Sequence, residues 1–141
     1  MIQAFNKKVN YYIPYFMPAD RSNISIEFDN NLKETIKEND QEIEYESFSS
    51  GEKTVLEISV AFSLFMLAKE FFSSSISFIV FDEILDGNLD DEASAKVAKV
   101  VSDLGESNSI MLISHRKDLK ESFDEHVLIE KDKNGFSFIK D

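Results

Sequence analysis

The sequence predicts an α/β fold with a parallel-sheet core, a small antiparallel β meander before it and a C-terminal β hairpin after it. Two apolar runs of strand length, residues 76–81 and 109–114, are separated by a helical pattern. This order is typical of parallel strands, because the intervening helix returns the chain to the edge where it started. Near the C-terminus, Asn134-Gly135 lies between two short apolar stretches and predicts a hairpin turn.

The composition predicts one globular domain over residues 1–141 and excludes several chemistries. Hydrophobic residues make up 43% of the chain and include 13 Phe, which is enough for a core. The lack of Cys excludes disulfides, thiolate metal sites and a cysteine nucleophile. No run is long enough for a membrane span and no signal-peptide pattern is present, so we expect a cytoplasmic protein, in the host cytoplasm if it is viral.

The strong negative charge limits the partners. The 27 Asp and Glu against 15 Lys and Arg give a formal charge of -12. Such a surface repels the phosphate backbone of nucleic acids. We therefore expect any DNA contact to be local, or to be made by other parts of a larger complex.

Residues 1–16 are expected to form an amphipathic helix. Apolar side chains recur there at the spacing of one helix face. Pro14 and Pro18 are expected to end the helix, because proline lacks the N–H that continues it. The pattern begins directly after Met1 without a capping residue, which suggests a helix cut from a longer helical parent.

Residues 23–48 are expected to form the antiparallel meander. Apolar and polar residues alternate there in short runs, which is the period of a strand with one covered face. Asn30-Asn31 and Asn39-Asp40 lie between the runs and are typical turn residues. The three expected strands cover residues 24–28, 32–36 and 43–45.

Residues 49–141 are expected to form the α/β part. A helix of about 20 residues begins after Gly51 and is apolar on nearly every side, so we expect it to be buried. The continuously apolar strands 76–81 and 109–114 predict a sheet that is covered on both faces. The other expected elements are a helix from Asp90 to Gly105, a short charged helix at 116–122, and hairpin strands at 127–130 and 136–139.

The turn before the buried helix, Ser49-Ser50-Gly51 followed by Glu52, is a candidate phosphate site. A helix N-terminus offers unpaired N–H groups and the positive end of the helix dipole. Gly51 allows close approach of an anion and Ser49 adds a hydroxyl donor. The alternative interpretation is that Ser49 or Ser50 only caps the helix, with Glu52 as the dipole partner in its first turn.

Three further candidates follow the two apolar strands. Asp82-Glu83 ends the first strand, where a Mg²⁺ with its waters would offset the cost of two adjacent carboxylates and the second carboxylate could orient an attacking water. His115 ends the next strand and can donate a hydrogen bond to a phosphate oxygen. The alternatives are solvent-exposed turn acids and a surface histidine.

Four motifs in this order resemble the carboxyl-terminal lobe of an ABC-type ATPase head of the SMC group. The resemblance is greatest to the SbcC-type DNA double-strand-break repair ATPases and the phage recombination endonuclease ATPase subunit. The motifs are "FSSGE" at 48–52 for the signature, "FIVFDE" at 78–83 for Walker B, "NLDDE" at 88–92 for the D-loop and "ISHR" at 113–116 for the switch histidine. Ser50 replaces a glycine of the usual signature, and the five residues 84–88 before the D-loop are one more than usual.

The resemblance implies a role for each candidate residue in a site for ATP and Mg²⁺. Asp82 would support the Mg²⁺ shell, Glu83 would position or deprotonate the attacking water, and His115 would contact the γ-phosphate in the same head. The signature residues Ser49, Ser50, Gly51 and Glu52 would face the γ-phosphate of ATP bound to the other head, with Asp90 lying across the dimer interface.

The resemblance also implies partners, because the chain has no G-x-x-x-x-G-K motif followed by Ser or Thr. The amino-terminal lobe of the same subunit would supply this Walker A loop, and a second head would complete a homodimer. Residues 1–16 would descend from the base of a coiled coil. A nuclease subunit would cut DNA, with DNA bound by the full complex, so ATP hydrolysis would drive DNA end processing or recombination and this lobe alone would be inactive.

Two other functions fit parts of the sequence. Asp82, Glu83 and Asp90 could form the acidic edge of a non-catalytic protein-interaction module that binds a basic partner. A two-metal nuclease site is poorly supported, because the acids lie in one short stretch and no second cluster faces them.

Overall fold

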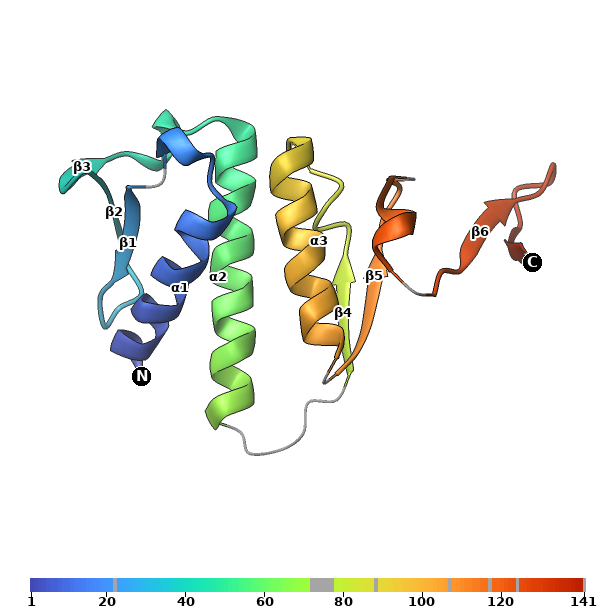
Figure 1. The fold of residues 1–141 in the computed structure, drawn as a ribbon, viewed down its shortest axis with the longest axis horizontal. Helices are drawn as coiled ribbons and strands as arrows, with labels where there is room; N and C mark the ends of the chain where they lie inside the picture. The colour runs from blue at the N-terminus through green and yellow to red at the C-terminus, as the bar shows by residue number, and fades with distance from the viewer. Residues whose placement is uncertain are drawn as a thin grey trace.

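The computed structural model describes residues 1–21, 23–71, 78–87, 89–106, 108–116, 118–123 and 125–140. Within these residues the fold has three α-helices and three small sheets (Figure 1). The helices are α1 (Ile2–Phe16), α2 (Ser50–Phe71) and α3 (Asp91–Gly105). The antiparallel meander consists of β1 (Ile24–Phe28), β2 (Glu34–Glu38) and β3 (Gln41–Ile43). The parallel pair is β4 (Phe78–Asp82) with β5 (Ser109–Ile113), and the hairpin is β6 (Leu128–Lys131) with β7 (Ser137–Lys140). The predicted α/β class with meander, parallel pair and C-terminal hairpin is confirmed.

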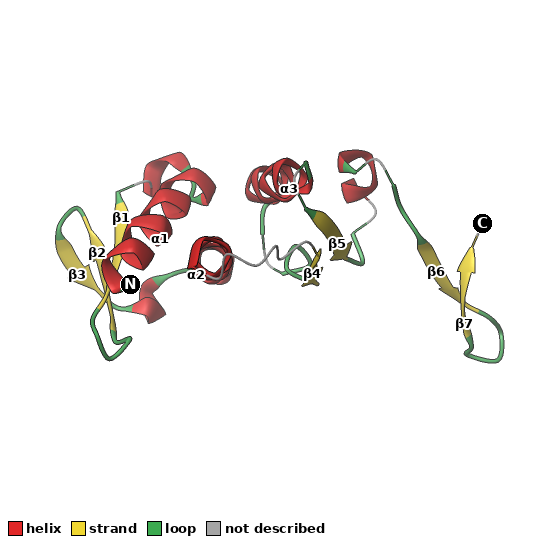
Figure 2. Ribbon diagram, turned by 90° about the horizontal axis from the view of Figure 1, so that it is seen from below, coloured by secondary structure: helices red, strands yellow, loops and turns green. Residues whose placement is uncertain are grey.

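From left to right in Figures 1 and 2, the meander, α1, α2, the parallel pair with α3, and the hairpin follow one another. The meander packs on α1, α1 packs on α2, α3 lies beside the parallel pair, and the hairpin extends away at the far end. Aromatic rings fill the seam between α1 and α2. Phe62 of α2 lies within 6.0 Å, centroid to centroid, of Tyr12, Phe16 and Phe81. None of the described helices is long and apolar enough to cross a bilayer.

Helix α1 passes through Pro14 and ends at Phe16, so the prediction that Pro14 helps to end the helix is wrong. Pro14 lies in the last turn and removes only its own N–H from the ladder, since the N–H of Met17 still donates to the carbonyl of Ile13 at 2.9 Å. The helix ends because Met17 precedes Pro18: a residue before proline is restricted to extended backbone, and Met17 has φ -63° and ψ 151°.

Asparagine side chains of α1 pair with the edge of the meander. Asn6 donates to the carbonyl of Phe28 and accepts from its N–H, both at 3.0 Å. Asn10 makes the same two bonds to Ile26, at 2.7 and 2.9 Å. Because an amide has the donor and acceptor of a peptide group, the two side chains continue the ladder of β1 at Ile26 and Phe28.

The second strand of the meander begins later in the sequence than predicted, and the third begins earlier. Leu32 has φ 62°, inside a turn in which Asp29 accepts backbone N–H bonds from Asn31 and Lys33, so β2 starts only at Glu34. The predicted turn at Asn39-Asp40 is confirmed, with φ values of 51° and 65°. It pairs Glu38 with Gln41, and β3 therefore ends at Ile43.

Strands β4 and β5 are parallel as predicted, but only one face of the pair is covered by the described residues. Side chains on that face are half-buried among the helices, among them Phe81. The other face exposes Phe78 (55%), Val80 (47%), Met111 (50%) and Ile113 (43%). The prediction of a sheet covered on both faces is therefore wrong for this chain, whose described helices lie against one face only.

Other predicted bounds changed less. The charged helix expected at 116–122 is a short 3-10 helix, Asp118–Ser122. Each hairpin strand begins one residue later than predicted, because hydrogen bonds from Gly135 and Phe136 to Asp132 close the turn. Residues 76 and 77 of the first apolar strand, and Asn88 of the predicted D-loop, lie outside the described residues.

Candidate functional site

The signature stretch forms a capping box at the start of α2. The backbone N–H of Ser49 donates to Oε2 of Glu52 at 2.7 Å, and the N–H of Glu52 donates to Oγ of Ser49 at 3.3 Å. Ser49 therefore caps the helix, as one of the two interpretations held. Its Oγ still lies at the exposed N-terminus of a 22-residue helix, where the dipole favours an anion.

The signature and D-loop stretches meet in one hollow of about 310 Å³. Asp90 is the N-cap of α3, and its Oδ1 accepts from the N–H of Ala93 at 2.7 Å. Two helix N-termini therefore converge here, with α2 on one side and α3 on the other. Leu89 also lines the hollow. All five residues predicted to bind nucleotide line it as well: Ser49, Ser50, Gly51, Glu52 and Asp90.

The carboxylate of Glu52 is already engaged within the chain. Besides its bond to Ser49, its Oε1 pairs with Arg21 at 3.2 Å. Arg21 also pairs with Glu38 of β2 at 2.8 Å and lies over the ring of Phe48, 5.0 Å from its centroid. Burial alone would raise the pKa of Glu52, but the two hydrogen bonds from Ser49 and the charge of Arg21 outweigh it and lower that pKa. Glu52 is thus placed to hold the loop in shape.

Ser50 and Gly51 belong to the first turn of α2. The carbonyl of Ser50 accepts a hydrogen bond from Oγ1 of Thr54 at 3.0 Å. The side chain of Ser50 is exposed at the start of the helix. Gly51 is helical, and Gly135 is the described glycine with a positive φ. Gly51 lines the hollow from within this first turn.

The second group of predicted residues lies at the carboxyl end of β4. Asp82 is exposed on the open face of the pair, the face that also carries Phe78 and Val80. Glu83 has φ 54°, a left-handed backbone that is uncommon for a residue with a side chain and that turns the chain sharply after the strand. Its N–H remains bound to the carbonyl of Ile113 at 2.9 Å, so the turn is anchored to β5.

Glu83 and His115 are brought together. Nε2 of His115 lies 3.1 Å from Oε1 of Glu83, although the two residues are 32 positions apart. Their side chains are 59% and 84% exposed, so both can reach a ligand. A carboxylate that can accept a proton from water now lies beside an imidazole that can bind a phosphate oxygen.

Asp86 is a third member of this group that sequence reasoning missed. Its Oδ1 accepts from the hydroxyl of Ser114, and its Oδ2 accepts from the backbone N–H of His115 at 2.6 Å. Glu83, Asp86 and His115 also offer ligand atoms within 4.8 Å of one another, a set that suits a divalent cation. The only local signal in the sequence is a third acid shortly after the strand.

The two groups lie at one edge of the molecule without sharing a pocket. The N-termini of α2 and α3 and the carboxyl ends of β4 and β5 are at the upper edge in Figure 1, yet neither Glu83 nor His115 lines the hollow. Contacts among the described residues join the groups. A Cβ on Gly87 would lie 3.3 Å from Thr54 of α2, and Arg116 donates to Ser94 at 2.6 Å and pairs with Asp91 at 3.3 Å, just after Asp90.

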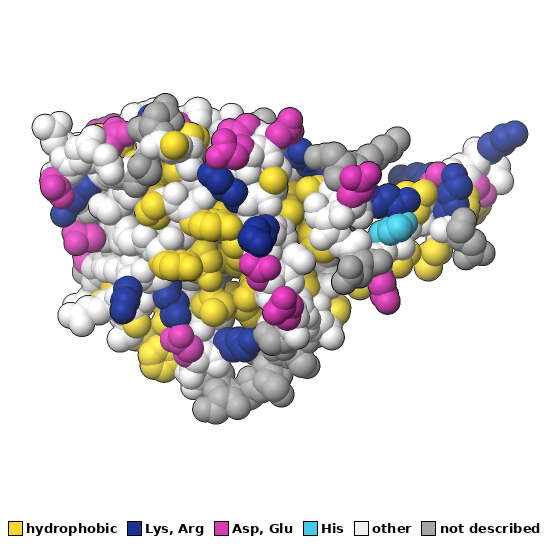
Figure 3. All heavy atoms as spheres, viewed as in Figure 1, with side chains coloured by type: hydrophobic (Ala, Val, Ile, Leu, Met, Phe, Trp, Pro, Cys, Tyr) yellow, Lys and Arg dark blue, Asp and Glu magenta, His cyan; other side chains and the backbone are white. Residues whose placement is uncertain are grey.

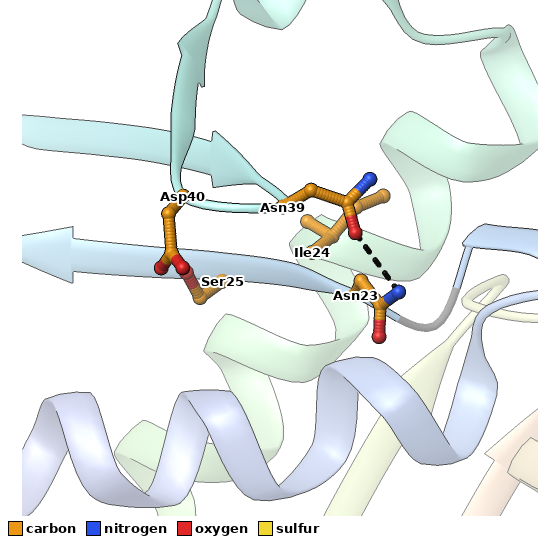
Figure 4. Close-up of a pocket in the computed structure, with 5 residues that line it drawn as sticks. All are labelled: Asn23, Ile24, Ser25, Asn39 and Asp40. Carbon is orange, nitrogen blue, oxygen red and sulfur yellow. Dashed lines mark hydrogen bonds between the residues drawn. The ribbon is translucent and has the colours of Figure 1, made fainter.

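A wider hollow of about 450 Å³ lies at the end of the β1–β2 hairpin (Figure 4). It is lined by Ile24 and four polar residues, with Asn23 donating to Asn39 at 3.0 Å and Asp40 as its carboxylate. None of the predicted site residues lines it. We assign it no role, because it is open and offers a ligand a single charged group.

No family model matches the sequence. The chain is 32% identical over 131 residues to "Exonuclease subunit 2" of Enterobacteria phage T4, which covers 92% of this chain. It spans about a fifth of the length of that relative, 22%.

Solved SMC heads have the same fold. A structure from work on ATP-driven dimerization and DNA-stimulated activation of SMC ATPases covers 99% of this chain and 83% of its own, with a TM-score of 0.75 and 18% identity. The SMC head domain from Thermotoga maritima covers 98% of this chain and 47% of its own, with a TM-score of 0.65 and 22% identity. The chain has the fold of an SMC head, and these likenesses agree with the predicted resemblance to a carboxyl-terminal head lobe. The hollow contains the residues predicted as the signature, and the end of β4 contains those predicted as Walker B.

Proposed function

We propose that this head lobe supplies two halves of different ATP sites in a dimer of heads. The observation that carries the proposal is the separation of the predicted residues into two groups. Ser49, Gly51 and Asp90 line one hollow, whereas Glu83 and His115 form a pair outside it. One group would serve ATP bound in its own head, and the other would serve ATP bound in the partner head.

In its own head, the Walker B group would act on the γ-phosphate. Asp82 would hold the Mg²⁺ shell, and the ion would neutralise charge that develops on the phosphate oxygens. Glu83 would position or deprotonate the attacking water. His115 would donate a hydrogen bond to a γ-phosphate oxygen, since its exposed ring is held beside Glu83.

Toward the partner head, the signature group would bind the opposite γ-phosphate. Ser49, Ser50 and Gly51 would present a hydroxyl-rich helix N-terminus, whose dipole and N–H groups suit an anion. Glu52 would keep this turn in shape through its bonds to Ser49 and Arg21. Asp90 would lie across the interface beside them.

The open face of β4 and β5 supports a need for a second lobe. Phe78, Val80, Met111 and Ile113 form an exposed apolar face beside Asp82, and such a face is unfavourable in water. An amino-terminal lobe carrying a Walker A loop would cover it and would bring the phosphates of ATP to Asp82. Residues 1–16 would then continue toward the coiled coil.

The larger role would be DNA end processing with a nuclease subunit, in the host cytoplasm of a phage. The name of the phage T4 relative, "Exonuclease subunit 2", supports an exonuclease complex. On the face drawn in Figure 3, acidic and basic side chains are interspersed, without a continuous basic surface. Together with the charge of -12, this supports DNA binding by the full complex, with this lobe contributing the ATPase half-sites.

The test is Glu83→Gln in a complete head, reconstituted from this chain and a lobe that supplies the Walker A loop. We expect ATP to bind and hold two heads together while hydrolysis falls by about 10² to 10³, the usual cost of removing one catalytic group. Glu106→Gln, an exposed acid after α3, is the matched control and should hydrolyse ATP at the wild-type rate. Normal hydrolysis by Glu83→Gln would contradict the proposal, and association indifferent to ATP would favour the interaction module.

A further inference from the structure

The loop that carries His115 is held to the chain after β4 by one carboxylate. Asp86 accepts from the hydroxyl of Ser114 with one oxygen and from the backbone N–H of His115 with the other, at 2.6 Å. The same hydroxyl oxygen of Ser114 accepts the N–H of Arg116 at 3.0 Å. Three consecutive residues, 114–116, are thus arranged around the side chain of Asp86.

Asp86 is itself fixed relative to Glu83. Its N–H donates to the carbonyl of Glu83 at 3.1 Å, which closes the turn in which Glu83 has its left-handed backbone. The side chain of Asp86 is half-buried, whereas the imidazole of His115 and the carboxylate of Glu83 are exposed. A single residue therefore connects the turn of Glu83 to the backbone of His115.

This connection matters because the imidazole has little other support. The side chain of His115 is 84% exposed and its contact with Glu83 spans 3.1 Å. An exposed ring on a free loop would sample many orientations, and a displacement of about 1 Å at a reacting group can cost about 10²-fold in rate. Fixing the backbone N–H of His115 restricts the positions from which its ring can meet Glu83.

We propose that Asp86 is a positioning residue that sets His115 against Glu83 for ATP hydrolysis. The inference rests on the proposed function, since it assigns a role within the same site. A carboxylate suits the task because two donors converge on it and it has two acceptor oxygens. Asn at this position keeps one acceptor for the N–H of His115, and the hydroxyl of Ser114 can rotate to accept from the new amide.

The test compares Asp86→Ala and Asp86→Asn in the complete head with ATP. We expect Asp86→Ala to lower kcat about 10- to 100-fold, with KM for ATP within about threefold, because the ring is misplaced while the phosphate-binding groups remain. Asp86→Asn should recover a substantial part of kcat. Asp103→Ala, an exposed acid on α3, is the matched control and should leave both constants unchanged.

A second variant keeps the test decisive if Asp86→Ala does not fold. Ser114→Ala removes the other donor to Asp86 and should lower kcat less, with the amide signal of His115 still in its hydrogen-bonded position in a ¹⁵N–¹H spectrum. Wild-type kcat in a folded Asp86→Ala would overturn the inference, and so would wild-type kcat in Ser114→Ala if Asp86→Ala does not fold. A parallel Glu83→Gln measurement separates the two claims. If Glu83→Gln loses hydrolysis and the Asp86 variants lose none, only the role of Asp86 is refuted. If Glu83→Gln hydrolyses ATP normally, the proposed function is refuted.

Discussion

Replacement of Ser49 separates its role as a helix cap from its proposed role in binding phosphate. In the free lobe, Ser49→Ala removes one acceptor for the N–H of Glu52, and that bond is long at 3.3 Å and exposed. We therefore expect a loss of about 0.5 to 1 kcal/mol in the free energy of unfolding, the low end of the range for N-caps. Ser49→Gly should cost only a few tenths of a kcal/mol, because glycine is itself an acceptable cap.

The effect on association of heads should be much larger than the effect on stability. A hydrogen bond from a hydroxyl to a charged phosphate contributes about 1.5 to 3 kcal/mol, which corresponds to about 10- to 100-fold in affinity at each site. Both Ser49→Ala and Ser49→Gly lose this bond. They should therefore weaken ATP-dependent association of heads by similar factors, although they differ in stability.

Two measurements check this prediction. Urea unfolding of the lobe gives the stability change, and sedimentation of complete heads with ATP, in a Glu83→Gln background that prevents hydrolysis, gives the affinity. Ser47→Ala is the matched control, since its hydroxyl donates to the carbonyl of Glu44 and it does not line the hollow. If Ser49→Gly associated within about twofold of the parent, the hydroxyl would be only a cap and the phosphate role would be refuted.

Two further predictions concern contacts that shape the site and the fold. Because folding lowers the pKa of Glu52 from 4.5, the ionised carboxylate stabilises the fold above that pH, and this stability is lost as pH falls through the lowered pKa. Acid unfolding of Glu52→Gln should therefore lack this pH-dependent loss. An acid-unfolding profile identical to that of the wild type would contradict the prediction. Asn10→Ala should cost about 1 to 3 kcal/mol in urea unfolding, because it leaves the N–H and C=O of Ile26 without their partners. Lys7→Ala, at an exposed position of the same helix, should change stability by less than about 0.5 kcal/mol, and equal costs for the two would refute the ladder.

Local chemistry explains which parts of the fold were predictable. The turn at Asn39-Asp40 and the hairpin turn at Asn134-Gly135 depend on neighbouring residues, and so does the end of α1 before Pro18. The capping box of Ser49 and Glu52 is also local, spanning three positions. Such features can be seen in a short window of sequence.

The missed features depend on residues that are far apart in the chain. Asn6 pairs with Phe28 across 22 positions, Asp86 contacts Ser114 across 28, and Arg21 joins Glu52 to the meander. No local spacing marks these partners. The open face of β4 and β5 was missed for a related reason: an apolar strand pattern shows that a face should be covered, but it does not show which polypeptide covers it.

The most direct test of the two half-sites is a mixture of two inactive heads. Heads with Glu83→Gln lack the catalytic carboxylate, and heads with Ser49→Arg lack the signature contact. In a two-fold dimer of one of each, both changes fall in one site and the other site is intact, so an equal mixture should recover about a quarter of wild-type ATP hydrolysis. If Ser49 and Glu83 served the same ATP, every site in the mixture would carry one change, and hydrolysis would not rise above that of the separate variants.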